Sequence, residues 1–255
     1  MGRCQRRRLK HSGLKTALSG IGAAHRFAKL PNPVRSYQVT EAMRGVAHIY
    51  GKKVKGRAAL RVAQLGHMSA ALASRPPKVA ARDRAICLFG TFAATRGGEL
   101  GAIDTAHLGR LPGGIDLFIP KSKTDQNQEG ETVFIGYAPQ PELCPLRALD
   151  AWLEIANITR GPIFRRIDAT GRVGHRALRT TAIRAIVKRG VKAIGVDPSP
   201  FGSHTLRTTF VTEAHRAGAS ELTIMKQTRQ ARLDTVERYL RDDDVRENIT
   251  ELIVR

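Results

Sequence analysis

The chain has 255 residues, with 43 Lys and Arg against 22 Asp and Glu, so its formal net charge is +21. Such a surplus raises a positive potential over much of the surface and favours polyanionic partners, either nucleic acid or an anionic membrane surface. The basic residues are spread along the chain, and no amphipathic stretch carries a broad Trp or Phe face, which favours nucleic acid.

The cysteines and the apolar runs limit the class of protein further. Cys4, Cys87 and Cys144 are far apart and form neither a CxxC motif nor a Cys/His pair, so we expect no disulfide framework, no metal site and no cofactor. No apolar run approaches the roughly 20 residues of a membrane span, and residues 11–30 are too interrupted for a secretory signal. We therefore expect a cytoplasmic protein without membrane partners.

The beginning of the chain is typical of a helical pair. Residues 14–30 and 37–50 carry apolar side chains at helical spacing, and "PNP" forces a turn between them. The stretch "GKKVKGRA", residues 51–58, is basic, flanked by glycines and poor in large apolar residues, which makes it the best linker candidate. We place the domain boundary there, giving segments 1–55 and 56–255.

Two helices are expected after the linker, over about 60–74 and 80–95, with the breaker "RPPK" between them. The second ends at "TRGGEL". Gly97 and Gly98 suit the left-handed conformation that closes a helix, which predicts Arg96 at the C-terminal end of a buried helix.

A β-hairpin follows. Two short β-rich runs, residues 115–119 and 132–135, flank a polar stretch of a dozen residues. This pattern predicts an antiparallel hairpin with a long loop, and Lys121 and Lys123 lie at the near end of that loop.

The remainder is expected to be helical. Pro145 suits the first turn of a helix whose apolar stripe includes Trp152, which we interpret as core packing. A long basic helix is expected over about 176–193. Ser203 then caps a helix that ends at Gly218, and the last two short helices start at two further caps, Ser220 and Asp234.

Five polar residues stand out along these elements. His204 and Arg207 are three apart on a helix and point to the same side, so both can reach one small anion. Alone, such a pair is more often a solvated or capping feature. Three other residues strengthen the functional interpretation: Arg96 at a helix end, Lys123 on a loop, and Tyr239 after a run of basic helices.

Four motifs in this order, "TRGGEL", "SKTD", "HTLR" and "DTVERYLR", resemble those of the tyrosine recombinases, the phage-integrase family of site-specific DNA recombinases. The resemblance covers about residues 59–245. It implies a mostly α fold with a small antiparallel β-sheet. The helical pair looks like the later part of the family's core-binding domain, which clamps DNA from the opposite side.

The resemblance also implies a chemistry that suits these residue types. Arg96 and Arg207 offer guanidinium forks to the non-bridging phosphate oxygens and stabilise the transition state. Tyr239 is the nucleophile, and His204 is its base or hydrogen-bond partner. Lys123 resembles the general acid for the leaving 5′-hydroxyl. The product is a 3′-phosphotyrosyl link, formed without ATP or metal.

Several of these residues also have structural interpretations. Arg96 can cap a helix whose C-terminal dipole favours its charge. Lys123 is the least secure assignment, because Lys121 is two residues away and loop lysines are usually solvated. Glu99 is expected to support the backbone of the arginine rather than to react.

The chain departs from the family pattern at two places. The family has Gly-His, or sometimes a tryptophan, nine residues before the nucleophile, whereas this chain has Arg229-Gln230. Gln230 can still donate an amide hydrogen bond to a phosphate oxygen. If the glycine is left-handed, Arg229 strains the turn by roughly 1–2 kcal/mol. About fifty residues also stand where a complete helical domain is normal, so either the first helices are missing or the chain begins at an internal start.

Two main hypotheses follow. The first is a recombinase that cuts and rejoins double-stranded DNA as a homo-tetramer. The alternative is a catalytically weak or silent remnant of a mobile element that binds DNA without recombining it. A type IB topoisomerase is a third and more distant interpretation. The target sequence, the direction of recombination and any accessory DNA-bending proteins are not encoded in these motifs.

Overall fold

The computed structural model describes residues 11–50, 58–120 and 130–230, and the chain divides into two compact units, Met1–Lys55 and Gly56–Arg255. The first unit holds α2 (His11–Phe27), the short 3-10 helix η1 (Pro33–Arg35) and α3 (Tyr37–Tyr50), so the helical pair is confirmed. The turn forms because the Asn32 side chain accepts a hydrogen bond from Val34 N at 3.1 Å.

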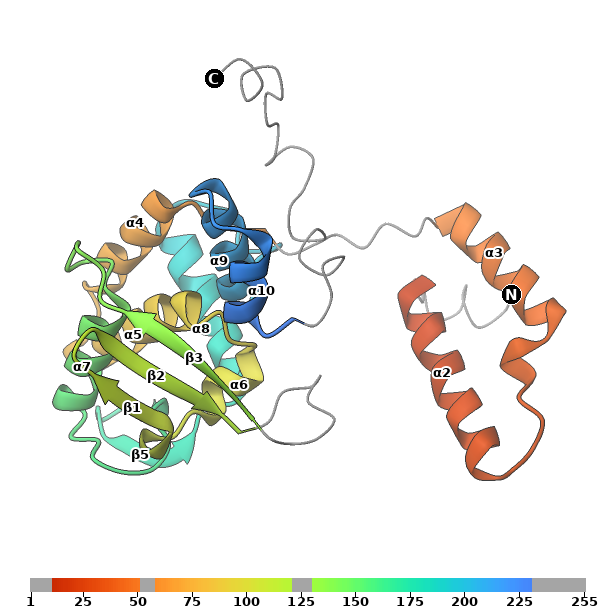
Figure 1. Ribbon diagram of the computed structural model, residues 1–255, viewed down its shortest axis with the longest axis horizontal. Helices are drawn as coiled ribbons and strands as arrows, with labels where there is room; N and C mark the ends of the chain where they lie inside the picture. The colour runs from red at the N-terminus through yellow and green to blue at the C-terminus, as the bar shows by residue number, and fades with distance from the viewer. Residues whose placement is uncertain (1–10, 51–57, 121–129, 231–255) are drawn as a thin grey trace, which may run out of the picture. The chain divides into compact units, whose positions relative to one another are not determined.

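The second unit is mostly helical with two small antiparallel sheets, which confirms the expected fold class (Figure 1). Its elements, in chain order, are α4 (Val62–Leu72), α5 (Pro77–Phe92), α6 (Gly97–Ala102), η2 (Thr105–His107), β1 (Leu108–Leu111), β2 (Gly114–Ile119), β3 (Glu131–Gly136), α7 (Pro145–Ile155), β4 (Arg165–Ile167), β5 (Val173–Ala177), α8 (Thr180–Ala193), α9 (Thr205–Arg216) and α10 (Glu221–Thr228).

The expected hairpin is β2 and β3, paired antiparallel with Ile119 opposite Glu131 at the end next to the connecting residues 120–130. β1 extends it to a three-stranded sheet in the order β1-β2-β3, and β4 pairs with β5 in a second sheet. Neither addition was predicted. The helix expected from about residue 176 begins only at Thr180, because Ala177 still pairs with Arg165 in the β4–β5 ladder.

The core is built around α5, which packs against α7, α9 and α4. Its residues are buried on all sides from Arg82 to Thr91, except for one half-buried position, so it carries no amphipathic stripe. Trp152 of α7 is fully buried, and its Nε1 donates a hydrogen bond to Ile163 O at 2.9 Å. The packing interpretation of this tryptophan is confirmed.

The prediction for the "TRGGEL" turn was wrong in its details. α5 ends at Phe92, the left-handed residue is Ala94 with φ 48°, and Arg96 is the N-cap of α6. Gly97 is the first residue of α6. A Cβ there would lie 2.5 Å from the Cβ of Ser203, so this glycine serves close packing rather than a left-handed turn.

The helix caps near the end of the described chain follow the sequence with one exception. His204, not Ser203, is the N-cap of α9. Gly218 ends that helix with φ 79°, and the Ser220 hydroxyl accepts a hydrogen bond from Thr223 N at the start of α10. The helix expected from Asp234 lies outside the described residues. Among the described helices, none has the length and apolarity that a membrane crossing requires.

Candidate active site

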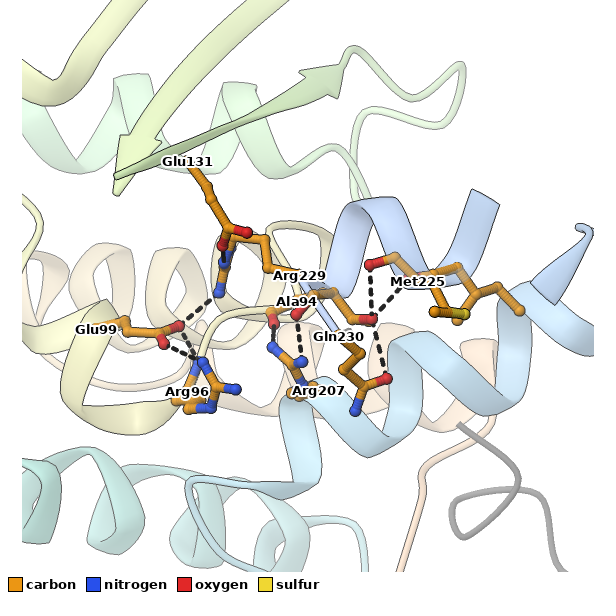
Figure 2. Close-up of polar contacts among 10 residues, drawn as sticks. Ala94, Arg96, Glu99, Glu131, Arg207, Met225, Arg229 and Gln230 are labelled. Carbon is orange, nitrogen blue, oxygen red and sulfur yellow. Dashed lines mark hydrogen bonds and ion pairs between the residues drawn. The ribbon is translucent and has the colours of Figure 1, made fainter. Parts of the chain in front are cut away.

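Three segments of the second unit meet at one place: the turn between α5 and α6, the start of α9, and the end of α10. Gly97 contacts Ser203 so closely that a methyl group would clash. One side chain, Arg207, then ties the segments together, because it donates hydrogen bonds to Ala94 O at 2.9 Å and to Thr228 O (Figure 2). The sequence places the first of these segments more than a hundred residues from the other two, and the fold brings them together.

Arg207 is one of the largest fully buried side chains of the protein, with 1% of its surface exposed. A buried guanidinium needs polar partners, since an isolated charge is strongly destabilised away from water. The Ala94 and Thr228 acceptors are both backbone carbonyls. Its position is therefore fixed by backbone from two other segments.

The second arginine of the site, Arg96, is held by its own helix. Its backbone N–H donates to Glu99 Oε2 at 2.8 Å, and its Nη1 donates to Glu99 Oε1 at 2.6 Å. The carboxylate thus closes a capping arrangement at the N-terminus of α6, where negative charge is favoured by the helix dipole. The expectation that Glu99 supports this arginine's backbone is confirmed. The Arg96 side chain remains 26% exposed.

Arg229 adopts the left-handed conformation that the family glycine implied, with φ 54° and ψ 53°. Its N–H bonds to Lys226 O, and the N–H of Gln230 reaches back to Met225 O, which is the hydrogen-bond pattern of a helix end normally closed by glycine. The expected strain is present. It is of the order of 1–2 kcal/mol.

Sequence reasoning treated Arg229 only as a source of strain and missed what its side chain does. Its Nη2 donates to Glu99 Oε2 at 2.5 Å, and its Nε lies 3.6 Å from Glu131 Oε2 at the start of β3. The side chain is 2% exposed. Figure 2 shows this guanidinium between the two carboxylates, with Arg96 on the other side of Glu99. A charged residue at a position that favours glycine was the only signal in the sequence.

The charges around Glu99 set its protonation. Burial by itself would raise the pKa of Glu99, but the positive charges of Arg229 and Arg96 and the hydrogen bond from Arg96 N outweigh it, so the pKa lies below its usual range. Burial lowers the pKa of Arg229 and Glu99 opposes that shift, with a net lowering. The guanidinium nevertheless stays charged at physiological pH.

His204 and Gln230 also lie in these segments. His204 is half-buried, and its carbonyl accepts hydrogen bonds from both N and Oγ1 of Thr208 at 3.0 Å, which fixes the start of α9. Gln230 is 8% exposed, and its Oε1 lies 3.1 Å from Oγ1 of Thr228. Four predicted site residues, Arg96, His204, Arg207 and Gln230, thus lie in segments that pack together.

Lys123 and Tyr239 lie outside the described residues. The described end of the hairpin is nevertheless part of the site, because Glu131 contacts Arg229. In the parts of the chain that the structure describes, no group of three or more His, Cys, Asp or Glu side chains is arranged to hold a metal ion.

No family model matches the chain. An integrase/recombinase XerD homolog from Selenomonas ruminantium is 34% identical over 230 residues, which cover 90% of this chain and 67% of that protein. Among solved structures, the integrase of transposon Tn1549 in complex with circular intermediate DNA aligns over 98% of this chain and 83% of its own, with TM-score 0.65 and 13% identity.

A lambda integrase dimer bound to a COC′ core site aligns with TM-score 0.59 and 21% identity, over 93% of this chain and 61% of its own. These structural likenesses establish the fold. The sequence identity to the XerD homolog extends over 230 of the 255 residues, and so into both units. The chain belongs to the tyrosine recombinases, the family of phage integrases and site-specific DNA recombinases.

Proposed function

We propose that the protein cleaves and rejoins double-stranded DNA at specific sites through a 3′-phosphotyrosyl intermediate at Tyr239. One observation supports this above all: Arg207 of α9 is hydrogen-bonded to the turn that presents Arg96. This hydrogen bond joins α9 to the turn that carries Arg96, which supports a shared role for the two guanidiniums. A phosphodiester under attack gathers charge on its non-bridging oxygens, and positioned guanidiniums stabilise that charge.

The remaining roles are proposed from residue chemistry and from the motifs of the family. Tyr239 stands nine residues after Gln230, and nine extended residues span at most roughly 30 Å, so the phenol can reach the site. Nearby cations favour its phenolate, and His204 accepts its proton or donates a hydrogen bond. Lys123 acts as the general acid for the leaving 5′-hydroxyl, and Gln230 donates to a phosphate oxygen.

The first unit is proposed to clamp DNA. Of the 43 Lys and Arg residues, thirteen fall in residues 1–55, where only one acidic residue is found. Such a segment is suited to sequence-independent phosphate contacts. Structural neighbours include a lambda integrase dimer on a core site and a tetramer on a Holliday junction. We infer that this chain also works as a homo-oligomer on DNA, and as a tetramer during strand exchange.

The decisive experiment captures a covalent adduct on DNA of any sequence, so the target site need not be specified in advance. The protein is incubated with a library of nicked duplexes of randomised sequence that release a short product on cleavage, and DNA that stays attached through denaturing detergent is sequenced. We expect enrichment of one sequence with wild-type protein and none with Tyr239→Phe. Tyr137→Phe, at an exposed tyrosine, is the matched control and should behave as the wild type.

Two outcomes would count against the proposal. An adduct that survives Tyr239→Phe means that another residue is the nucleophile. DNA binding without any adduct favours the silent remnant. Gln230→His should raise the cleavage rate, and an unchanged rate would contradict the role given to that position.

A further inference from the structure

The turn after α10 carries Arg229, whose side chain makes more contacts than a residue that merely stands in place of glycine would need. Arg229 occupies a left-handed position, where a side chain costs free energy, and it buries that side chain almost completely. A long charged side chain that is only tolerated would extend into solvent. This one lies instead between two carboxylates from other segments, Glu99 and Glu131.

The contact with Glu99 bears on Arg96. Glu99 Oε2 accepts from both Arg96 N and Arg229 Nη2, while Oε1 accepts from Arg96 Nη1. With one carboxylate shared between two guanidiniums, Arg96 is only partly neutralised, and the carboxylate that orients it is fixed from a second side. Without Arg229, Glu99 would pair with Arg96 alone and would be held by fewer bonds.

The contact with Glu131 bears on the electrostatics of the site. Glu131 begins β3, and its carboxylate is 44% exposed. An uncompensated negative charge at this place would oppose the approach of a DNA phosphate. The Arg229 guanidinium, 3.6 Å away, offsets that charge.

We propose that Arg229 is a positioning residue for strand cleavage, which acts by holding Glu99 so that Arg96 keeps both its orientation and its charge toward the phosphate. This inference rests on the proposed function. It predicts that glycine at position 229, the usual residue of the family, would give slower cleavage than arginine, even though glycine relieves the backbone strain.

Three substitutions at Arg229 separate the effect of its side chain from the effect of its strained backbone. Arg229→Gly removes the strain and the charge, Arg229→Met keeps the strain and much of the packing but removes the charge, and Arg229→Lys keeps the charge without the fork. We expect Gly and Met to slow cleavage of a nicked duplex at saturating DNA on the order of 10- to 100-fold, as for a misplaced catalytic group. Lys should be intermediate, and DNA affinity should change much less than the rate.

A double-mutant cycle with Glu99→Gln tests the route of the effect. If Arg229 acts through Glu99, then Arg229→Met should slow the Glu99→Gln enzyme by less than about 3-fold, far less than it slows the wild type. The same cycle is measured on the unfolding equilibrium constant, which needs no activity. The two residues should be coupled there as well.

The outcomes distinguish the inference from the function on which it rests. A wild type that forms no adduct refutes the proposed function, and the unfolding cycle then decides whether Arg229 and Glu99 act together. A wild type that cleaves, with Arg229→Gly equally fast or faster, overturns the inference and leaves the proposed function intact. Additive effects of the two substitutions on both readouts also overturn it.

Discussion

The two units of the chain differ in how they bury their apolar side chains. In the described part of the first unit only Gly22 and Ala47 are buried, while Phe27 and Tyr37 are 94% and 76% exposed. The second unit has a continuous core that runs from Leu60 to Leu206. The contrast indicates that the second unit can hold a defined site by itself, whereas the helical pair has little core to stabilise it.

Large apolar side chains that are exposed on a basic helical pair are typical of an interaction surface. In the described part of the second unit, no large apolar side chain is more exposed than Leu222, at 62%. The candidate site lies there, where α6, α9 and α10 meet. Substitutions in the two units test this difference, and their effects on stability should decrease from the core of the second unit to the helical pair of the first.

The largest effect is expected for Phe89→Ala. Phe89 is fully buried in α5, and its ring centroid lies 6.4 Å from that of Phe164. Removing a buried phenyl ring should lower the free energy of unfolding by about 3–5 kcal/mol. Denaturant titration checks this, because the single tryptophan of the chain, Trp152, lies in the same core and its fluorescence reports the second unit. A loss below about 1 kcal/mol would contradict the packing described.

Glu99→Gln should have the next largest effect, and the effect should depend on pH. The carboxylate is bonded to two guanidiniums, so its loss should cost about 2–3 kcal/mol at pH 7. Since its pKa is depressed in the folded protein, the stabilisation is present above the unfolded pKa of about 4.3 and is lost as the pH falls through the lower, folded value.

Unfolding titrations from pH 7 to pH 3 check the Glu99 prediction. The gap in stability between the wild type and Glu99→Gln should narrow below about pH 4.3. Glu154→Gln, at an exposed position on α7, is the control and should show no such gap. A difference in the free energy of unfolding that stays constant across this pH range would mean that the negative charge of Glu99 does not contribute to stability.

A smaller effect is expected for Gly97→Ala. The added methyl group would meet Ser203 Cβ at 2.5 Å and push α6 away from the start of α9. We expect a loss of about 1–2 kcal/mol, in the lower part of the range for overpacking, together with slower DNA cleavage. The matched control is Gly98→Ala, where the nearest atom is Thr180 Oγ1 at 3.7 Å. Equal effects of the two substitutions would argue against close packing at Gly97.

The smallest effect is expected in the first unit. Met43 of α3 is only half-buried, so Met43→Ala should leave the fluorescence transition of Trp152 unchanged within about 0.5 kcal/mol. Its consequence should appear instead in DNA affinity and in the salt dependence of binding, if the helical pair is the clamp. A shift of the Trp152 transition similar to that of Phe89→Ala would show that the two units share one core.

Sequence patterns predicted the elements with strong local signals and missed those set by distant contacts. The hairpin, the proline-started α7 and the Ser220 cap followed from residue types alone. The β4–β5 pair did not, because its register depends on partners rather than on alternation in either strand. Gly97 was assigned to a left-handed turn, since its clash partner Ser203 lies over a hundred residues away.

The site shows the same division. Motif order indicated which arginines belong together, and the structure places Arg96 and Arg207 beside the same turn. What could not be predicted is the network that holds them. The two carbonyl acceptors of Arg207 have no sequence signature. The ion pairs of Arg229 could not be predicted either, because this arginine stands where the family has glycine and was expected only to strain the backbone.

Arg207 draws its carbonyl partners from positions 113 and 21 residues away in the chain. No short segment can therefore assemble the candidate site alone, and a chain that has not completed its fold lacks a fixed guanidinium at this position. An enzyme that breaks the backbone of DNA benefits from this dependence, because the capacity to cut arises only in the finished domain.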